Sequence, residues 1–220
     1  MASALLAGIA VLIIGDSHLT TPKYLITSLH EDLVAQGAQV HTLGVCGANA
    51  AEWMVATPGT CGSAERIDKG PVKLRGETAP TIPIKTLIAD EKPNLVIIVM
   101  GDTMAGYKMT TFPKTSIWTQ VTGLTKAIAA TKTTCVWVGP AWGTEGGKFN
   151  KTFARVELMS NFLGNNVAPC VYIDSLKFSK PGAWATTDGQ HLTEAYYKVW
   201  GDAIAKQLVT LPAVLALKKK

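Results

Sequence analysis

The sequence predicts an α/β fold in which a parallel sheet is covered by helices. Short apolar runs rich in β-branched residues alternate with longer amphipathic runs along the 220 residues, as such a sheet requires. The run "NLVIIVMG" is apolar on both faces, which is typical of a strand with helices on each side. There is no internal repeat and no low-complexity linker, so we expect a single domain over residues 1–220.

Five strands and five helices are expected. The strands are predicted near residues 9–14, 39–45, 94–100, 134–139 and 170–174, and the helices near 22–36, 84–91, 114–131, 149–165 and 192–209. Pro22 fits the first turn of a helix, where its missing N–H costs nothing. The segment 58–83 is rich in glycine and proline and is predicted to be a long loop, with a hairpin near "PVKLRGE" as an option. A structural and a functional role of this loop are both open.

Composition limits the class of protein. Hydrophobic residues make up 47% and charged residues 17%, which indicates a globular chain. The net charge of +5 would suit an anionic polymer, but the basic residues cluster only at Lys218–Lys220 and no nucleic-acid motif is found. The apolar run Ala4–Ile14 is about half of a membrane span, so we expect no integral membrane segment. We interpret Met1–Ser3 as an artificial start from which a signal peptide has been removed.

The four cysteines permit two disulfides, and their spacing does not match a zinc site. Cys46 and Cys61 bracket a loop, whereas Cys135 and Cys170 each lie at the start of a predicted strand. We favour the pairs Cys46–Cys61 and Cys135–Cys170, and hence an exported protein, periplasmic or secreted. The alternative is a cytoplasmic protein in which buried thiols act as small apolar side chains.

Ligands of an open parallel sheet bind beyond the carboxyl ends of its strands. Ser17 lies at such an end, within "GDSH", where it can serve as a nucleophile. His18 is adjacent to it in sequence, and adjacent side chains usually diverge, while His30 and His41 lie within a predicted helix and a predicted strand. None of these three is therefore the favoured base.

His191 is the better candidate base because it follows Asp188 by three residues. In such a loop the carboxylate can fold back onto Nδ1 of the imidazole and leave Nε2 to face a serine. Ser17, His191 and Asp188 are therefore the predicted catalytic residues. The simpler alternative is that Asp188 is a turn residue and His191 a residue at the start of a helix.

These segments, taken together, resemble the SGNH (GDSL-type) hydrolase superfamily over nearly the whole chain. The matching blocks are "IIGDSH", Gly47 after the second strand, Gly101 after the third, and "TDGQHLTEAYYKVWGDAI". The resemblance implies a flavodoxin-like three-layer α/β/α sandwich, here with a five-stranded parallel sheet, and esterase-type acyl transfer. It also implies that Ser17 is the nucleophile, His191 the base and Asp188 its orienter, with the N–H groups of Ser17 and Gly47 in the oxyanion hole.

One block departs from the pattern of the family. The third block is Gly-x-Asn in the family, but Thr103 stands here at the asparagine position, after Asp102. A threonine hydroxyl can donate one hydrogen bond, whereas an ionised Asp102 would repel an oxyanion. Asn49 is a candidate replacement donor. Because a missing donor typically costs about 10²–10³ in rate, the departure leaves room for acyl transfer to an alcohol instead of water.

The expected substrate is an O-acyl group, most simply an O-acetyl group, of a carbohydrate or polysaccharide. Aromatic faces suit sugar rings, and the candidate cleft comprises His18, Asn49, Trp53, Asp102, Tyr107, Trp142 and Trp184, although such aromatics are often core residues. The alternatives are a polysaccharide O-acetyltransferase, a weakly active glycan-binding or assembly factor of the same fold, and a lipase or lysophospholipase. The first turn contains no phosphate loop, so we expect no nucleotide, flavin or other cofactor, and no metal. The sequence leaves the oligomeric state open.

Overall fold

A computed structural model describes residues 4–219, in which a single seven-stranded sheet has the order β4-β3-β2-β1-β5-β6-β7. The strands are β1 (Ala10–Gly15), β2 (Gln39–Val45), β3 (Ser63–Ile67), β4 (Lys73–Leu74), β5 (Leu95–Val99), β6 (Thr134–Val138) and β7 (Val171–Ile173). Strands β2, β1, β5, β6 and β7 run parallel, in close agreement with the five predicted positions. The two extra strands are antiparallel, so the sheet is mostly and not wholly parallel.

The prediction of five strands was wrong because the segment 58–83 contains a hairpin. Its first strand, β3, pairs with β2, and Asp68 at a positive φ of 46° begins the turn towards β4. This hairpin starts before the "PVKLRGE" stretch in which one was considered. The sequence "SAERI" of β3 is largely polar and lacks an alternating apolar pattern, so it gives no strand signal.

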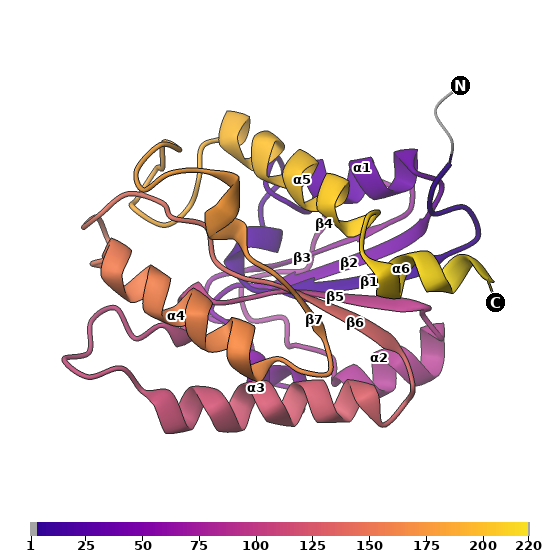
Figure 1. Cartoon of the computed structure of the whole chain (residues 1–220), viewed down its shortest axis with the longest axis horizontal. Helices are drawn as coiled ribbons and strands as arrows, with labels where there is room; N and C mark the ends of the chain where they lie inside the picture. Colours follow the sequence, from indigo (N-terminus) through magenta and orange to yellow (C-terminus); the bar gives the residue numbers. More distant parts are fainter. Residues whose placement is uncertain (1–3, 220) are drawn as a thin grey trace.

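Helices cover both faces of the sheet (Figure 1). They are α1 (Ser28–Ala35), α2 (Ile84–Glu91), α3 (Lys114–Ala129), α4 (Phe153–Asn166), α5 (Glu194–Leu208) and the short α6 (Pro212–Leu215). Figure 1 shows α1 and α5 on one side of the sheet and α2, α3 and α4 on the other. The predicted three-layer α/β/α sandwich is therefore confirmed.

The first helix begins later than predicted. Lys23 has a positive φ of 78°, which interrupts a helix, and the chain makes turns until α1 begins at Ser28. Ser17 is the first residue of a separate three-residue 3-10 helix, which precedes α1. The other four long helices begin and end within about four residues of their predicted limits.

The core consists of two apolar layers separated by the sheet. In β1, Leu12 and Ile14 pack on the layer under α2, α3 and α4, whereas Val11 and Ile13 pack on the layer under α1 and α5. All four side chains are buried, and each contributes about 1.5–3 kcal/mol of transfer free energy. Burial on both faces explains why the strand sequences are continuous apolar runs.

Both predicted disulfides are present. Cys46–Cys61 joins the residue after β2 to the loop before β3, and Cys135–Cys170 joins β6 to the residue before β7. None of the helices in the described part of the chain is long and apolar enough to span a bilayer.

Candidate active site

Ser17 lies at the carboxyl end of β1, beside β2 and β5. At Gly15, the last residue of β1, a Cβ atom would overlap the carbonyl oxygen of Val99 in β5, so the close approach of the two strands requires glycine. Asp16 then caps the 3-10 helix η1 (Ser17–Leu19) by accepting a hydrogen bond of 3.1 Å from a backbone N–H of its first turn. This turn holds the Ser17 side chain at the edge of the sheet.

His191 and Asp188 reach Ser17 from the turn that precedes α5. The Ser17 hydroxyl lies 2.7 Å from His191 Nε2, and His191 Nδ1 lies 2.7 Å from Asp188 Oδ2. The second carboxylate oxygen of Asp188 accepts the backbone N–H groups of Gln190 and His191 at 3.0 and 2.8 Å. The three side chains therefore form a continuous Ser–His–Asp hydrogen-bonded chain, whose carboxylate is fixed by its own turn.

The electrostatic environment suits a neutral base. Burial disfavours the imidazolium form of His191, and the neighbouring His18 adds to this effect, so the pKa of His191 is lowered. Burial alone would raise the pKa of Asp188, but the hydrogen bonds from His191 and Gln190 outweigh it and lower that pKa. At neutral pH, His191 can thus accept a proton while Asp188 carries the charge that orients it.

A cavity of about 450 Å³ opens beside Ser17, and Gly47 and Thr103 line it together with the three residues above. Gly47 has a positive φ of 83°, and a Cβ atom there would lie 2.7 Å from the Thr60 hydroxyl oxygen. The Thr103 hydroxyl is buried and has no hydrogen-bond partner within residues 4–219. A buried donor without a partner is costly, and the residue that carries this hydroxyl lines the cavity.

Asp102 also lines the cavity, but cationic and hydroxyl groups surround its carboxylate. Oδ1 accepts hydrogen bonds from Lys151 Nζ, at 2.8 Å, and from the Tyr107 hydroxyl, and Oδ2 lies 2.9 Å from His18 Nε2. Burial acts to raise the pKa of Asp102, but Lys151 and His18 outweigh it and hold that pKa well below its usual value. The expected repulsion of an oxyanion by Asp102 is therefore offset by a buried cation.

His18 is placed behind the site and not in the cleft that the sequence suggested. Its side chain is buried, with Nδ1 at 2.7 Å from the Tyr197 hydroxyl and Nε2 on Asp102. Its ring lies 5.3 Å from that of His191, between centroids. His18 therefore supports the site from within the core.

Asp16, next to the nucleophile, is fully buried as well. One of its carboxylate oxygens caps the 3-10 helix, and the other has no partner among the described residues. Burial raises the pKa of Asp16 to about 6. The hydrogen bond to the turn gives Asp16 a structural role.

Three tryptophans predicted to line the cleft lie elsewhere. Trp53 is fully buried in the core, Trp184 is buried against Tyr196, and the indole N–H of Trp142 donates to the carbonyl oxygen of Leu176. Burial of a large aromatic ring is favourable in free energy because it removes much apolar surface from water. Proximity in sequence to a strand end therefore did not place these rings in the cleft.

Asn49 is also displaced from the predicted role. Its side-chain oxygen accepts the N–H groups of Ala51 and Glu52 and so caps the 3-10 helix η2 (Ala50–Trp53). Asn49 is not among the residues that line the cavity. Of the two alternative residues considered from the sequence, Thr103 is therefore the one that lines the cavity.

Tyr107 does line the cavity, and several residues that the sequence did not indicate line it as well. These are Cys46, Cys61, Gly106, Lys108, Met109, Lys148, Phe149 and Gln190. Phe149 packs edge-on against His191, with 5.6 Å between ring centroids. The glycine-rich stretch "GTEGGKF" before it was the available signal of a loop shaped around a site.

No family model matches the chain. Protein BcsX of Komagataeibacter xylinus is 44% identical over 218 residues, which cover 98% of this chain and 82% of BcsX. An identity of this size over nearly the whole length indicates common descent.

Solved structures with the same fold are more distant in sequence. A protein of Slackia heliotrinireducens classed as an SGNH hydrolase superposes with a TM-score of 0.61 at 18% identity, covering 90% of this chain and 97% of that one. TesA gives 0.60 at 16% identity, over 90% and 97% of the two chains. The acetyl xylan esterase AlAXEase gives 0.58 at 14% identity, over 91% and 100%. The chain thus has the SGNH (GDSL-type) hydrolase fold and belongs to the same family as Protein BcsX.

Proposed function

We propose that this protein is a serine carboxylic-ester hydrolase that removes O-acyl groups, most simply O-acetyl groups, from a carbohydrate. The observation that carries the proposal is the hydrogen-bonded chain from Ser17 through His191 to Asp188, which opens into a cavity. This arrangement supports the proposal, because acyl transfer through an enzyme ester requires a nucleophile, a base and an orienting carboxylate within hydrogen-bond distance of one another.

In the first half of the reaction, the Ser17 oxygen attacks the carbonyl carbon of the ester while its proton passes to His191 Nε2. Asp188 stabilises the imidazolium that forms. The negative charge on the former carbonyl oxygen is met by the N–H groups of Ser17 and Gly47 and by the Thr103 hydroxyl. When the tetrahedral intermediate collapses, the carbon–oxygen bond to the leaving alcohol breaks and His191 returns the proton to that alcohol.

In the second half, water attacks the acyl-enzyme while His191 takes one of its protons. Collapse releases the carboxylic acid and returns the proton to Ser17. An alcohol in place of water would give a new ester by the same steps, so a polysaccharide O-acetyltransferase is the close alternative. The ratio of the two reactions depends on which acceptor the cavity holds best.

The carbohydrate assignment is supported by the aromatic side chains of Tyr107 and Phe149, which line the cavity and can contact the C–H faces of a sugar ring. It is further supported by the fold shared with an acetyl xylan esterase. A lipase or lysophospholipase would instead prefer long acyl chains. Comparing p-nitrophenyl esters of increasing chain length separates the two, because we expect acetate to be the best substrate.

Turnover of p-nitrophenyl acetate by wild type and by Ser17→Ala tests the proposal. We expect the variant to lose activity by about 10³-fold or more, because no other group can form the acyl-enzyme. A wild-type protein treated with a phosphonate ester should gain one covalent adduct in its intact mass, and Ser17→Ala should gain none. Equal slow rates of the two proteins, with no adduct in either, would contradict the proposal.

A second candidate is a glycan-binding or assembly factor with little turnover, which the threonine at position 103 favours. For such a protein, binding of an acetylated glycan would be the same in wild type and in Ser17→Ala, and no acyl-enzyme would form. Isothermal titration calorimetry with acetylated xylan oligosaccharides, together with intact-mass measurement, distinguishes it from the enzyme.

The two disulfides support an exported protein, because disulfides persist in oxidising compartments. Fractionation of cells that carry the full gene would test this location. Recovery with the cytoplasmic fraction, with four reduced thiols, would contradict it.

A further inference from the structure

A buried ion pair lies directly behind the cavity. The Lys151 side chain is fully buried, and its ammonium group donates to Asp102 Oδ1 at 2.8 Å and to the carbonyl oxygen of Ala141 at 2.9 Å. Asp102 is 4% exposed and also accepts hydrogen bonds from His18 and Tyr107. Neither charge of this pair takes part in the acyl-transfer steps described above.

The pair connects parts of the site that come from different strand ends. Asp102 precedes Thr103 in the 3-10 helix η3 (Asp102–Met104) after β5, while Ala141 follows β6. The backbone of Lys151 pairs with Gly146 to close the loop that carries Phe149 onto His191.

This loop also contacts the turn of the acid and base. The N–H of Lys148 donates to the carbonyl oxygen of Asp188 at 2.9 Å, and the N–H of Thr144 donates to that of Gly189 at 3.0 Å. Lys151 therefore sits where the oxyanion side and the acid–base side of the cavity are joined.

Because the pair is buried, its net charge has a strong electrostatic effect on the neighbouring groups. In a region of low dielectric constant, an uncompensated carboxylate at Asp102 would act strongly on its surroundings. Two charges that develop during acyl transfer lie nearby: the oxyanion beside Thr103, which Asp102 would repel, and the imidazolium of His191, which Asp102 would stabilise. A cation held against Asp102 cancels most of both effects.

We propose that Lys151 is a positioning residue that neutralises Asp102, so that a carboxylate can stand beside the oxyanion hole without opposing the developing negative charge. The inference rests on the proposed function for the meaning of the oxyanion hole. It explains how a Gly-Asp-Thr sequence is compatible with a Ser–His–Asp chain. The other titratable or charged groups near the pair are Asp16, His18, Tyr107, Tyr197, Arg155 and, on the acid–base side, Asp188. All of them stay in place in the variants below.

Three variants test the inference: Lys151→Met, Asp102→Asn and the double variant Lys151→Met/Asp102→Asn. We expect Lys151→Met to lower the Ser17-dependent turnover of p-nitrophenyl acetate by roughly 10- to 100-fold, less than the loss of an oxyanion donor itself. The double variant, which buries no net charge, should recover to within about fivefold of wild type. The matched control is Lys198→Met/Asp202→Asn, which removes an exposed ion pair of α5 and should leave turnover unchanged.

A second readout does not depend on turnover. The imidazole of His191 can be titrated by NMR with isotope-labelled histidine and assigned by its absence in His191→Gln. Without Lys151 the Asp102 carboxylate, left with only His18 and Tyr107 as partners, should raise the pKa of His191. Without Asp102 the Lys151 ammonium, left with only the carbonyl oxygen of Ala141, should lower it. The acidic limb of the pH–rate profile should move in the same directions, because His191 must be neutral to act as the base.

Opposite shifts in the two single variants, with recovery in the double variant, would support the charge-balancing role. A double variant that folds but is as inactive as Lys151→Met, or His191 titrations that are alike in all variants, would overturn it. If Lys151→Met fails to fold, the double variant decides: activity within fivefold and an unshifted His191 support the role, and activity below one-hundredth contradicts it. If wild type itself shows no Ser17-dependent turnover, the proposed function fails, while the His191 titrations still test the charge balance.

Discussion

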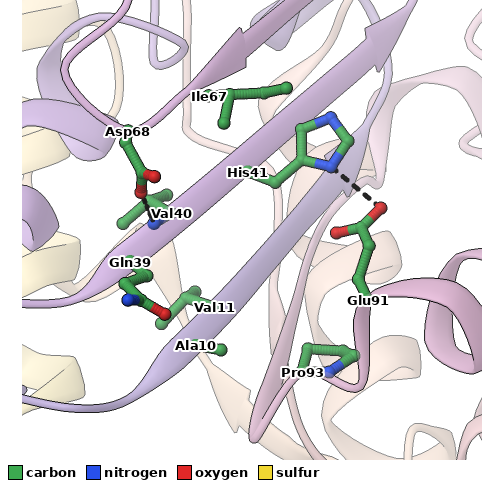
Figure 2. A pocket seen from close by; sticks show the side chains of 9 residues that line it. All are labelled: Ala10, Val11, Gln39, Val40, His41, Ile67, Asp68, Glu91 and Pro93. Carbon is green, nitrogen blue, oxygen red and sulfur yellow. Dashed lines mark hydrogen bonds and ion pairs between the residues drawn. The ribbon is translucent and has the colours of Figure 1, made fainter.

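The two edges of the sheet carry similar side chains in different arrangements. At the carboxyl edge, His191 contacts one carboxylate and one hydroxyl beside a cavity of about 450 Å³. At the amino edge, His41 contacts two carboxylates, Glu65 through Nε2 at 3.0 Å and Glu91 through Nδ1 at 2.9 Å. Figure 2 shows His41 and Glu91 in the pocket at this edge, whose volume is only about 110 Å³.

The difference sets the preferred protonation state of each imidazole. Both ring nitrogens of His41 face acceptors, so both must carry hydrogen, and only the imidazolium provides this. Burial opposes the charge, but the hydrogen bonds to Glu91 and Glu65 outweigh it and raise the pKa of His41. His191 faces a carboxylate on one side and a hydroxyl donor on the other, so it is neutral and free to accept a proton.

Hydroxyl groups differ between the edges in the same way. Next to His41, in the middle of β2, the buried Thr42 hydroxyl lies 2.8 Å from Nδ1 of His30. Nε2 of His30 donates at 2.7 Å to the carbonyl oxygen of Asp68, which lines the pocket at the amino edge. At the carboxyl edge, the Thr103 hydroxyl has no partner in the described residues. The threonine hydroxyl on the side that stabilises the fold is hydrogen-bonded, whereas the one on the side where we place the substrate is not.

The largest effect that tests this contrast is expected from Thr103→Val. Removing this proposed oxyanion donor should lower kcat for p-nitrophenyl acetate by about 10²-fold. Stability should change little, because the hydroxyl makes no hydrogen bond within residues 4–219. Thr103→Ser should keep most of the activity.

The counterpart at the amino edge is Thr42→Val, which should destabilise the protein by about 1 kcal/mol and leave kcat unchanged. Steady-state kinetics and thermal unfolding of the three variants provide the measurement. A loss of kcat in Thr42→Val as large as in Thr103→Val would remove the distinction between the edges.

Features set by short stretches of sequence could be predicted. The positions of the buried strands along the chain follow from continuous apolar runs. The contacts between Asp188 and His191 follow from a spacing of three residues within one turn. The contact between Ser17 and His191 joins residues far apart in the sequence. The SGNH resemblance implied it, and the two side chains do lie at hydrogen-bond distance.

Features set by packing between distant segments could not be predicted. Lys151 lies in a loop with no local sign that its side chain would be buried against Asp102. Trp142 comes after β6 and Trp184 after β7, on the side where cleft residues are expected, but their rings pack into the protein. The polar strand β3 is held by its partner strand and not by an apolar face of its own.

The two disulfides provide the next test, because one lies at each edge. Cys46–Cys61 lines the cavity next to Gly47, and the N–H of Cys46 donates to the carbonyl oxygen of Gly62 at 2.8 Å. Cys135–Cys170 is buried at the start of β6. Removing either should cost roughly 2–4 kcal/mol of stability, since each closes a loop of the unfolded chain.

Only the double variant Cys46→Ser/Cys61→Ser should also lower kcat, by about 10-fold, or about 1.4 kcal/mol of transition-state stabilisation. The Gly47 N–H would then lose its fixed position in the proposed oxyanion hole. Cys135→Ser/Cys170→Ser should be destabilised at least as much, because its disulfide closes the longer loop and lies in the core, but should be fully active at a temperature well below its Tm. Equal kcat values for the two double variants would show that the cavity-lining disulfide has no part in positioning Gly47.

The last test of the contrast is the pH dependence of stability, which is expected to change in His41→Gln. Because the folded-state pKa of His41 is raised above 6.5, its ion pairs stabilise the protein fully below pH 6.5 and lose this contribution as the pH rises through the folded-state value. The variant should therefore be destabilised most at pH 5.5, by about 1.5 kcal/mol, the usual size for a hydrogen bond to a charged group. At pH 9 the difference from wild type should be small.

Urea unfolding at both pH values measures this effect. Comparing variant with wild type at each pH cancels the contribution of other carboxyl groups that titrate in the same range, such as Asp16 and Asp32. Esterase activity should be unaffected, since His41 and the cavity lie at opposite edges of the sheet. A destabilisation that grows with pH would mean that His41 is neutral in the folded state, and the two imidazoles would then not differ in the way their partners imply.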